Sequence, residues 1–88
     1  MAHVSQDELA QRLKEASALV EVGARYRHYK YPDQEYVLKS LAILEADESV
    51  AVVYEGQYGV FASYIRPLSS WVETVEWEGQ RVPRFSKI

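Results

Sequence analysis

The N-terminal part of the chain repeats apolar and polar positions with the period of an amphipathic helix. Its apolar side chains recur at i, i+4, i+7 and i+11 and form one narrow stripe: Leu9, Leu13, Ala16 and Val20. Ser5 is a suitable N-cap, and Glu8 completes a capping box. Gly23 is the residue type that commonly follows a helix end. The pattern predicts a helix over residues 5–22, preceded by a flexible segment over residues 1–4.

Beyond Gly23 the pattern changes to short apolar and aromatic runs separated by turn residues. β-branched and aromatic side chains favour strands, whereas Pro, Gly, Asp and Ser favour turns. The runs that predict strands cover residues 24–31, 35–44, 50–54, 60–66, 72–77 and 80–85. The run over 35–44 has an ambiguous period that would allow a helix, but its flanking turns favour a strand. Residues 68–71 have room for one helical turn.

One helix followed by about five or six short strands predicts a mainly β domain over residues 24–88. A small closed or nearly closed barrel suits this pattern, because closure removes exposed sheet edges. The apolar stripe of the helix must be covered. The helix could cap one end of its own barrel, or it could pack against a second copy and form a homodimer. Capping of its own barrel is the more economical arrangement.

Composition and charge limit the classes of protein that remain. The 88 residues fit one domain, and the absence of cysteine excludes disulfides and thiolate zinc sites. A net charge of −3 weakens the case for nonspecific nucleic-acid binding. The chain does not start with a basic segment followed by an apolar run, and no apolar stretch approaches the ~20 residues of a spanning helix. We expect a cytoplasmic protein without a membrane span.

Several short segments occur in an order that resembles a known family. They are Tyr26-Arg27-His28-Tyr29-Lys30, Val53-Tyr54, Tyr58-Gly59, Arg66-Pro67-Leu68, Trp71, Glu73-Thr74-Val75, Gly79 and Val82-Pro83-Arg84-Phe85. Over residues 24–86 this ordered set is similar to a bacterial family catalogued as domain-of-unknown-function family 1653. The resemblance implies a small all-β domain, a Src-homology-3-like barrel, with no assigned activity. The chain departs from the family pattern at 31–33, where many members have glycines, and at 44–49, where many have a histidine.

No set of residues predicts catalysis or metal binding. The histidines are His3, near the terminus, and His28, between Arg27 and Tyr29 on a predicted strand. One histidine with scattered carboxylates does not supply the three or four ligands of a metal site. There is no glycine-rich phosphate loop and no nucleophile elbow. We therefore expect a protein that is not an enzyme and that holds no cofactor or metal.

Aromatic residues give the strongest functional signal. The chain has seven tyrosines, two tryptophans and two phenylalanines, which is more rings than a barrel of this size can bury. One interpretation is that most of them pack in the core or at the rim. The other is that some form a binding face with arginines as polar anchors. The candidate residues for this face are Tyr26, His28, Tyr29, Tyr54, Tyr58, Tyr64, Arg66, Trp71 and Arg84.

These observations favour a noncatalytic binding or adaptor module that recognises a peptide or protein partner through an aromatic face. A first alternative is binding of single-stranded nucleic acid, because Arg25, Arg27 and Lys30 lie beside tyrosines; the acidic total argues against it. A second alternative is an enzyme or enzyme subunit for a small ligand. That function would require His28 in a concave pocket near a carboxylate or an arginine.

Overall fold

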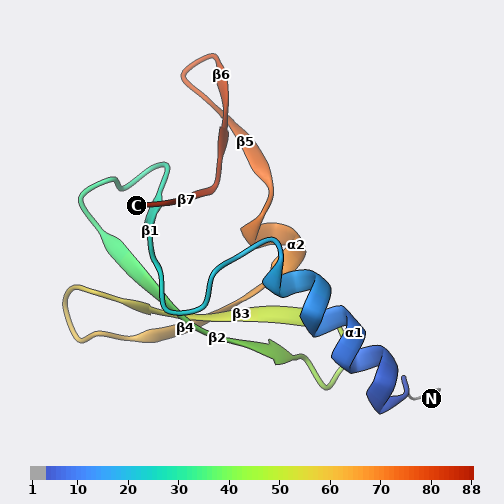
Figure 1. The fold of residues 1–88 in the computed structure, drawn as a ribbon. Helices are drawn as coiled ribbons and strands as arrows, with labels where there is room; N and C mark the ends of the chain where they lie inside the picture. The colour runs from blue at the N-terminus through green and yellow to red at the C-terminus, as the bar shows by residue number, and fades with distance from the viewer. Residues whose placement is uncertain (1–3) are drawn as a thin grey trace.

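Figure 1 shows the fold as a computed structural model, which describes residues 4–88. In this part of the chain two helices and seven strands follow one another: α1 (Gln6–Ser17), β1 (Arg25–His28), β2 (Glu35–Ile43), β3 (Val50–Gly56), β4 (Ser63–Pro67), α2 (Leu68–Trp71), β5 (Thr74–Trp77), β6 (Gln80–Pro83) and β7 (Phe85–Lys87). The protein is therefore mainly β with an N-terminal helix, as predicted. Residues 1–3, including His3 and most of the predicted flexible start, lie outside the described residues.

Helix α1 begins where the capping pattern predicts and ends earlier than predicted. The Ser5 hydroxyl accepts a hydrogen bond from the Glu8 backbone N–H at 3.1 Å. The helix ends at Ser17 rather than at residue 22, because the chain turns there to reach the sheet. Gly23 adopts a φ of +89° and donates its N–H to the Leu38 carbonyl at 2.7 Å, which a continued helix would not allow.

Removal of the Ser5 cap should destabilise the protein modestly. Ser5→Ala leaves the Glu8 N–H without its side-chain acceptor, and we expect the free energy of unfolding to fall by about 1 kcal/mol. Urea unfolding followed by circular dichroism measures the change. Ser86→Ala, on the exposed face of β7, is the matched control. Equal stability of the two variants would contradict the cap assignment.

The strands form one five-stranded sheet and one separate hairpin. The main sheet is antiparallel with the order β4-β3-β2-β1-β7, and β5 pairs with β6 alone. The register of β2 on β3 shifts between Leu38 and Ser40, which marks a β-bulge. Figure 1 shows the β5–β6 hairpin projecting away from the main sheet. The predicted strand over 35–44 is confirmed, and the predicted runs over 50–54 and 60–66 contribute the paired neighbouring strands β3 and β4.

The prediction of a closed barrel is wrong for residues 4–88. β4 and β7 are the two ends of the main sheet and do not pair with each other. The cause lies in residues 80–85, which were expected to form one closing strand. This run breaks at Arg84, whose carbonyl accepts the Tyr29 N–H at 3.0 Å and whose N–H donates to the Glu73 carbonyl at 2.9 Å. The Src-homology-3-like topology stays a prediction.

The hydrophobic core lies between the main sheet, α1 and α2. Its buried side chains are Val20, Tyr26, Tyr36, Leu38, Val52, Tyr54, Trp71 and Phe85. Ala16 and Val20 are the members of the predicted helix stripe that become fully buried, and α1 packs on β2 and β3 of its own chain. Aromatic rings therefore supply much of the core.

No helix within residues 4–88 has the length and apolar character needed to cross a bilayer.

Candidate functional site

The buried rings form one cluster on a single face of the main sheet. Trp71 of α2 stacks on Phe85 of β7, with ring centroids 3.8 Å apart and planes 8° from parallel. Tyr54 on β3 contacts Trp71 at 4.9 Å, and Tyr26 on β1 contacts it at 5.2 Å, both edge-on. Tyr36 on β2 completes the set at 5.5 Å from Tyr54. We call these five side chains the ring cluster, and it ties β1, β2, β3, β7 and α2 together.

Two more tyrosines extend the ring cluster to the surface. Tyr64 on β4 lies directly opposite Tyr54 and is 39% exposed. The hydroxyls of Tyr58 and Tyr36 share a hydrogen bond at 2.9 Å. This bond is the main reason why the pKa of Tyr58 is raised, and hydrogen bonding to Tyr58 in turn raises the pKa of Tyr64. The hydroxyls of Tyr58 and Tyr64 therefore stay protonated at neutral pH, and the Tyr64 hydroxyl lies at the exposed end of this group.

Gly56 holds Tyr58 in place through its missing side chain. A Cβ at this position would lie 3.0 Å from Cε1 of Tyr58. Gly56→Ala should displace the ring and break the bond to Tyr36, at a cost of about 1–3 kcal/mol of unfolding free energy. The same substitution in a Tyr58→Ala background should cost clearly less, because the clash is absent. Urea unfolding of the four proteins tests this, and equal costs in both backgrounds would contradict it.

Two arginines lie where the ends of the main sheet fail to pair. Arg66 of β4 donates from Nη1 to the Ser70 hydroxyl at 2.9 Å, and its guanidinium carbon is 5.5 Å from the centre of the Phe85 ring. Arg84, between β6 and β7, donates from Nε to the Ser70 carbonyl at 3.1 Å and from Nη2 to Glu73 at 2.6 Å. We call Arg66, Arg84, Phe85 and the nearby His28 the arginine seam. Ser70 of α2 fixes both guanidinium groups.

Arg66 carries an unusual orphan donor. Its Nε is buried and has no hydrogen-bond partner. Within the described residues no carboxylate forms an ion pair with Arg66, whereas Arg84 pairs with Glu73. Buried donors in proteins nearly always have partners, so an unpaired one needs an explanation. Arg66 therefore has an N–H donor that could bind an additional acceptor.

His28 lies among aromatic rings and positively charged side chains. Its ring is 4.6 Å from Tyr29 and 5.1 Å from Phe85, centre to centre. Its Nδ1 accepts the Lys30 backbone N–H at 3.1 Å. Burial lowers the pKa of His28 first, and the positive charges of Arg66, Arg84 and Lys30 lower it further. His28 is therefore neutral at pH 7.

The lowered pKa of His28 predicts a loss of stability in mild acid. As the pH falls, His28 is protonated in the unfolded chain before it is protonated in the folded chain. The stabilisation that comes from neutral His28 is therefore complete above the unfolded pKa of ~6.5 and is lost as the pH falls toward the lower pKa of His28 in the folded chain. Protonation would also remove the Nδ1 lone pair that accepts from Lys30. Tyr31 stacks on the ring, with the two ring centres 5.8 Å apart.

Urea unfolding of the wild type and of His28→Asn at about pH 7 and about pH 5.5 measures this loss. Asparagine keeps an acceptor near Lys30 and does not titrate. We expect the wild type to lose more stability between the two pH values than the variant. Identical losses would show that His28 does not carry the effect.

The structure separates the predicted binding residues into two groups. Tyr26, Tyr54 and Trp71 are buried, because they fill the core that β1, β3 and α2 enclose, so they contribute little to the surface. The remaining candidates are partly exposed. His28, Arg66 and Arg84 belong to the seam and Tyr29 contacts His28, whereas Tyr58 and Tyr64 contact the ring cluster at Tyr36 and Tyr54. Sequence reasoning missed Tyr36, Phe85 and Ser70. The i, i+2 spacing of Tyr36 and Leu38 is a signal that could have placed Tyr36 on the inner face of a strand, whereas no signal marks Ser70.

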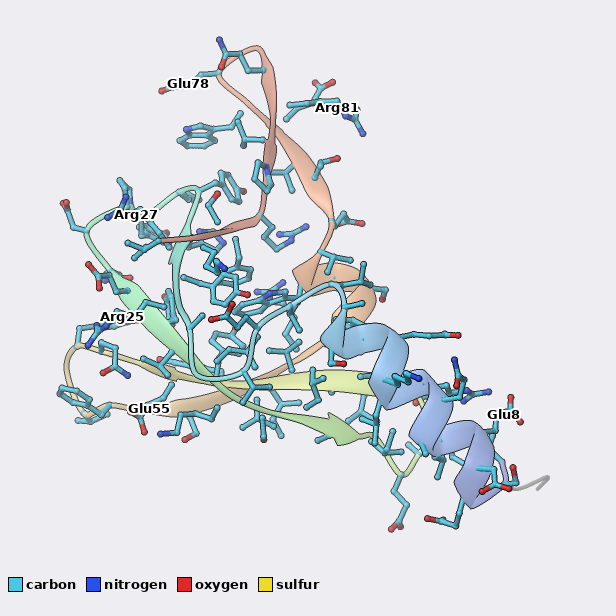
Figure 2. All side chains as sticks on the ribbon, in the orientation of Figure 1. Glu8, Arg25, Arg27, Glu55, Glu78 and Arg81 are labelled. Atoms are coloured by element: carbon cyan, nitrogen blue, oxygen red, sulfur yellow. The ribbon has the colours of Figure 1, made fainter. Side chains whose placement is uncertain are left out.

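Of the residues of the nucleic-acid alternative, Arg25 and Arg27 lie on the other face of β1 from His28, whereas Lys30 borders the seam through its bond to His28. Arg25 and Arg27 project outward from β1 in Figure 2, and Arg25 forms an ion pair with Glu35 at 3.1 Å. Lys30 lies over the Tyr31 ring at 5.7 Å. The described residues contain no group of three or more His, Cys, Asp or Glu side chains that could hold a metal ion. Two surface hollows, one beside the segment that follows α1 and one between α1 and the start of α2, are lined by residues other than His28.

The fold and the seam define a small, mainly β domain in which a curved antiparallel sheet holds two arginines against a ring cluster. The family described as "Protein of unknown function (DUF1653)" matches residues 24–87, well over half of the chain. The chain belongs to this family, which confirms the predicted resemblance. Helix α1 lies outside the matched residues.

A solved structure agrees with this assignment. The crystal structure of a protein of the same family from Bordetella bronchiseptica superposes with a TM-score of 0.66 and is 32% identical in sequence. The match covers 75% of this chain and 85% of that chain. No curated protein matches the chain.

Proposed function

We propose that this protein is a noncatalytic binding module that recognises a peptide or protein partner at the arginine seam and the adjoining edge of β4. The observation that carries the proposal is the open end of the main sheet. Within residues 4–88 no strand pairs with the outer edge of β4. An unpaired edge can accept an extended peptide as an added strand, with pockets beside it for alternate side chains.

Side chains beside this edge suit such a ligand. Tyr64 and Arg66 alternate with Ile65 on β4, so both lie on the face that carries the ring cluster. Tyr64 offers an exposed ring and Arg66 a charged donor, a combination that is enriched at the centres of protein interfaces. Ile65 lies on the opposite face and is 64% exposed. One face of β4 therefore carries the side chains suited to recognition, and Ile65 on the other face offers a control substitution.

A noncatalytic role is supported by the surroundings of His28. A general acid or base needs a tuned pKa and a geometry that reaches a substrate proton. The groups around His28 are rings, cations and the Lys30 N–H, and no ion pair joins His28 to a carboxylate within residues 4–88. The enzyme alternative asked for an arginine near His28, and two are present. Their contribution lowers the basicity of the imidazole rather than raising it.

A random peptide library displayed on phage tests the proposal. We expect selection of peptides whose resonance shifts map to β4 and the seam in NMR titrations. Tyr64→Ala should weaken binding about tenfold or more, as for an interface hot spot, whereas Ile65→Ala should leave it nearly unchanged. Failure to select any peptide, or equal effects of the two variants, would overturn the proposal. Titration with single-stranded RNA at low salt separates out the nucleic-acid alternative, because binding there would map to Arg25 and Arg27.

A further inference from the structure

We infer that the arginine seam is a binding site for a single carboxylate group, supplied by an acidic side chain or by the C-terminus of the partner. This inference rests on the proposed function and specifies what the partner must contain. It follows from the balance of charge at the seam, from the unused donors of Arg66 and from the rigid placement of both guanidinium groups.

The seam has one more positive charge than its own residues neutralise. Arg66 and Arg84 supply two cations, and Glu73 supplies the one carboxylate that pairs with either of them among the described residues. The Glu73 side chain is 57% exposed, so it neutralises little beyond its partner Arg84. His28 adds no charge at pH 7 because its pKa is lowered. Lys30, whose charge also acts on His28, is exposed beside the Tyr31 ring and is not counted among the seam residues. One further negative charge would balance the two arginines.

Arg66 retains donors that a carboxylate could accept. A guanidinium has five N–H donors in a planar fork, and within residues 4–88 Arg66 uses one of them, on Ser70. Its buried Nε has no partner at all. Nε and the adjacent terminal nitrogen form one edge of the fork, which matches the two oxygens of a carboxylate. A ligand that engages this edge after a small side-chain shift would satisfy the orphan donor.

The guanidinium groups are already held in position before a ligand arrives. Ser70 accepts from Arg66 through its hydroxyl and from Arg84 through its carbonyl, so one residue of α2 sets both. The centre of the Phe85 ring lies 5.5 Å from the guanidinium carbon of Arg66, and the same ring stacks on Trp71. Arg84 and the Phe85 ring therefore need not move when a ligand binds, and the rearrangement is confined to the Arg66 side chain, which has to shift to expose its buried Nε.

The charges and free donors of the seam suit a carboxylate better than a phosphate. A carboxylate brings one negative charge and two acceptor oxygens, which fit the single excess charge and the single free guanidinium edge. A phosphate monoester carries about −1.5 to −2 charges at neutral pH and three acceptor oxygens. At the seam it would leave excess negative charge on a chain whose net charge is already −3. Phosphate is therefore the discriminating comparison ligand.

NMR titration with small blocked amino acids tests the inference. N-acetylglutamate α-amide carries a side-chain carboxylate, N-acetylglutamine a terminal carboxylate, and N-acetylglutamine amide carries neither. We expect one or both acids, but not the amide, to shift the Arg66 Nε–H resonance and to raise the pKa of His28. The acid that binds more tightly identifies the source of the group. Shifts that are equal for the acids and the amide, or tighter binding of inorganic phosphate, would overturn the inference.

Variants give an independent check. Arg66→Gln should weaken the binding of the acid by about tenfold or more, as expected for the loss of a charged hydrogen-bond donor. Arg66→Lys keeps the charge but loses the fork, and should also weaken binding. Arg81→Gln, on the β5–β6 hairpin, removes the same charge from an exposed site and should have no effect. Unchanged binding by both Arg66 variants would overturn the inference. If a variant does not fold, the rise of the His28 pKa when the wild-type protein binds the acid remains as the test.

This experiment fails separately from the test of the proposed function. If selected peptides bind at β4 but contain neither an acidic residue nor a free C-terminus, the carboxylate site is wrong and the binding module stands. If the acids bind at Arg66 but the library gives no peptide, the carboxylate site stands as a small-molecule site and the peptide function is wrong.

Discussion

Replacement of Trp71 with alanine should lower the free energy of unfolding by about 3–5 kcal/mol, because it leaves a large cavity in the core. Trp71 is 2% exposed and touches three other members of the ring cluster. Domains of this size have total stabilities of about 5–15 kcal/mol. The variant should therefore be partly unfolded at ordinary temperatures, and urea unfolding followed by far-ultraviolet circular dichroism measures the loss.

Trp77 provides the matched control for this experiment. It is 37% exposed on the projecting hairpin, and its ring contacts Tyr29 at 5.3 Å. Trp77→Ala removes the same side chain and should cost about 1 kcal/mol or less, the value of an exposed aromatic pair. If both tryptophan variants lost similar stability, the ring cluster would not be the centre of the core.

Leu38→Ala should cost about 2–5 kcal/mol, the second-largest effect that we expect. Leu38 is 0% exposed and lies opposite Tyr54 in the pairing of β2 with β3. Its backbone also accepts from Gly23 and donates to the Ala24 carbonyl at 3.1 Å, which joins β2 to the segment after α1. Alanine keeps both backbone bonds, so the loss reports the side chain alone.

Leu19→Ala is the control, because Leu19 is 64% exposed and the substitution should change stability by no more than about 0.5 kcal/mol. Calorimetric melting temperatures of the two variants give the comparison. A Leu38 variant as stable as the Leu19 variant would mean that the central strands are not packed around this residue.

The elements that local patterns determine were predictable from the sequence. The Ser5 cap, the β-branched run of β3 and the turn at Glu78-Gly79 each follow from the preferences of a few adjacent residues. The pairing of β3 with β4 followed from two runs separated by a short glycine-containing segment. These features depend on contacts between near neighbours in the chain, which periodicity records directly.

Features that depend on distant contacts were not predictable in this way. Residues 80–85 have the alternation of one strand, but Arg84 forms hydrogen bonds with Tyr29 and Glu73 that break the strand in two. Helix α1 stops early because Gly23 pairs with Leu38 on β2. The candidate list contained both arginines, yet only the folded chain brings them to Ser70.

The β5–β6 hairpin stands apart from the rest of the molecule. It turns at Glu78 and Gly79, which both have positive φ, and the Trp77 ring contacts Tyr29 beyond β1. Loop tips of this kind tolerate added sequence well. A reporter domain or an affinity tag spliced between Glu78 and Gly79 would extend into solvent and leave every strand of the main sheet paired as before. The tip is therefore the place to immobilise the protein or attach a fluorophore.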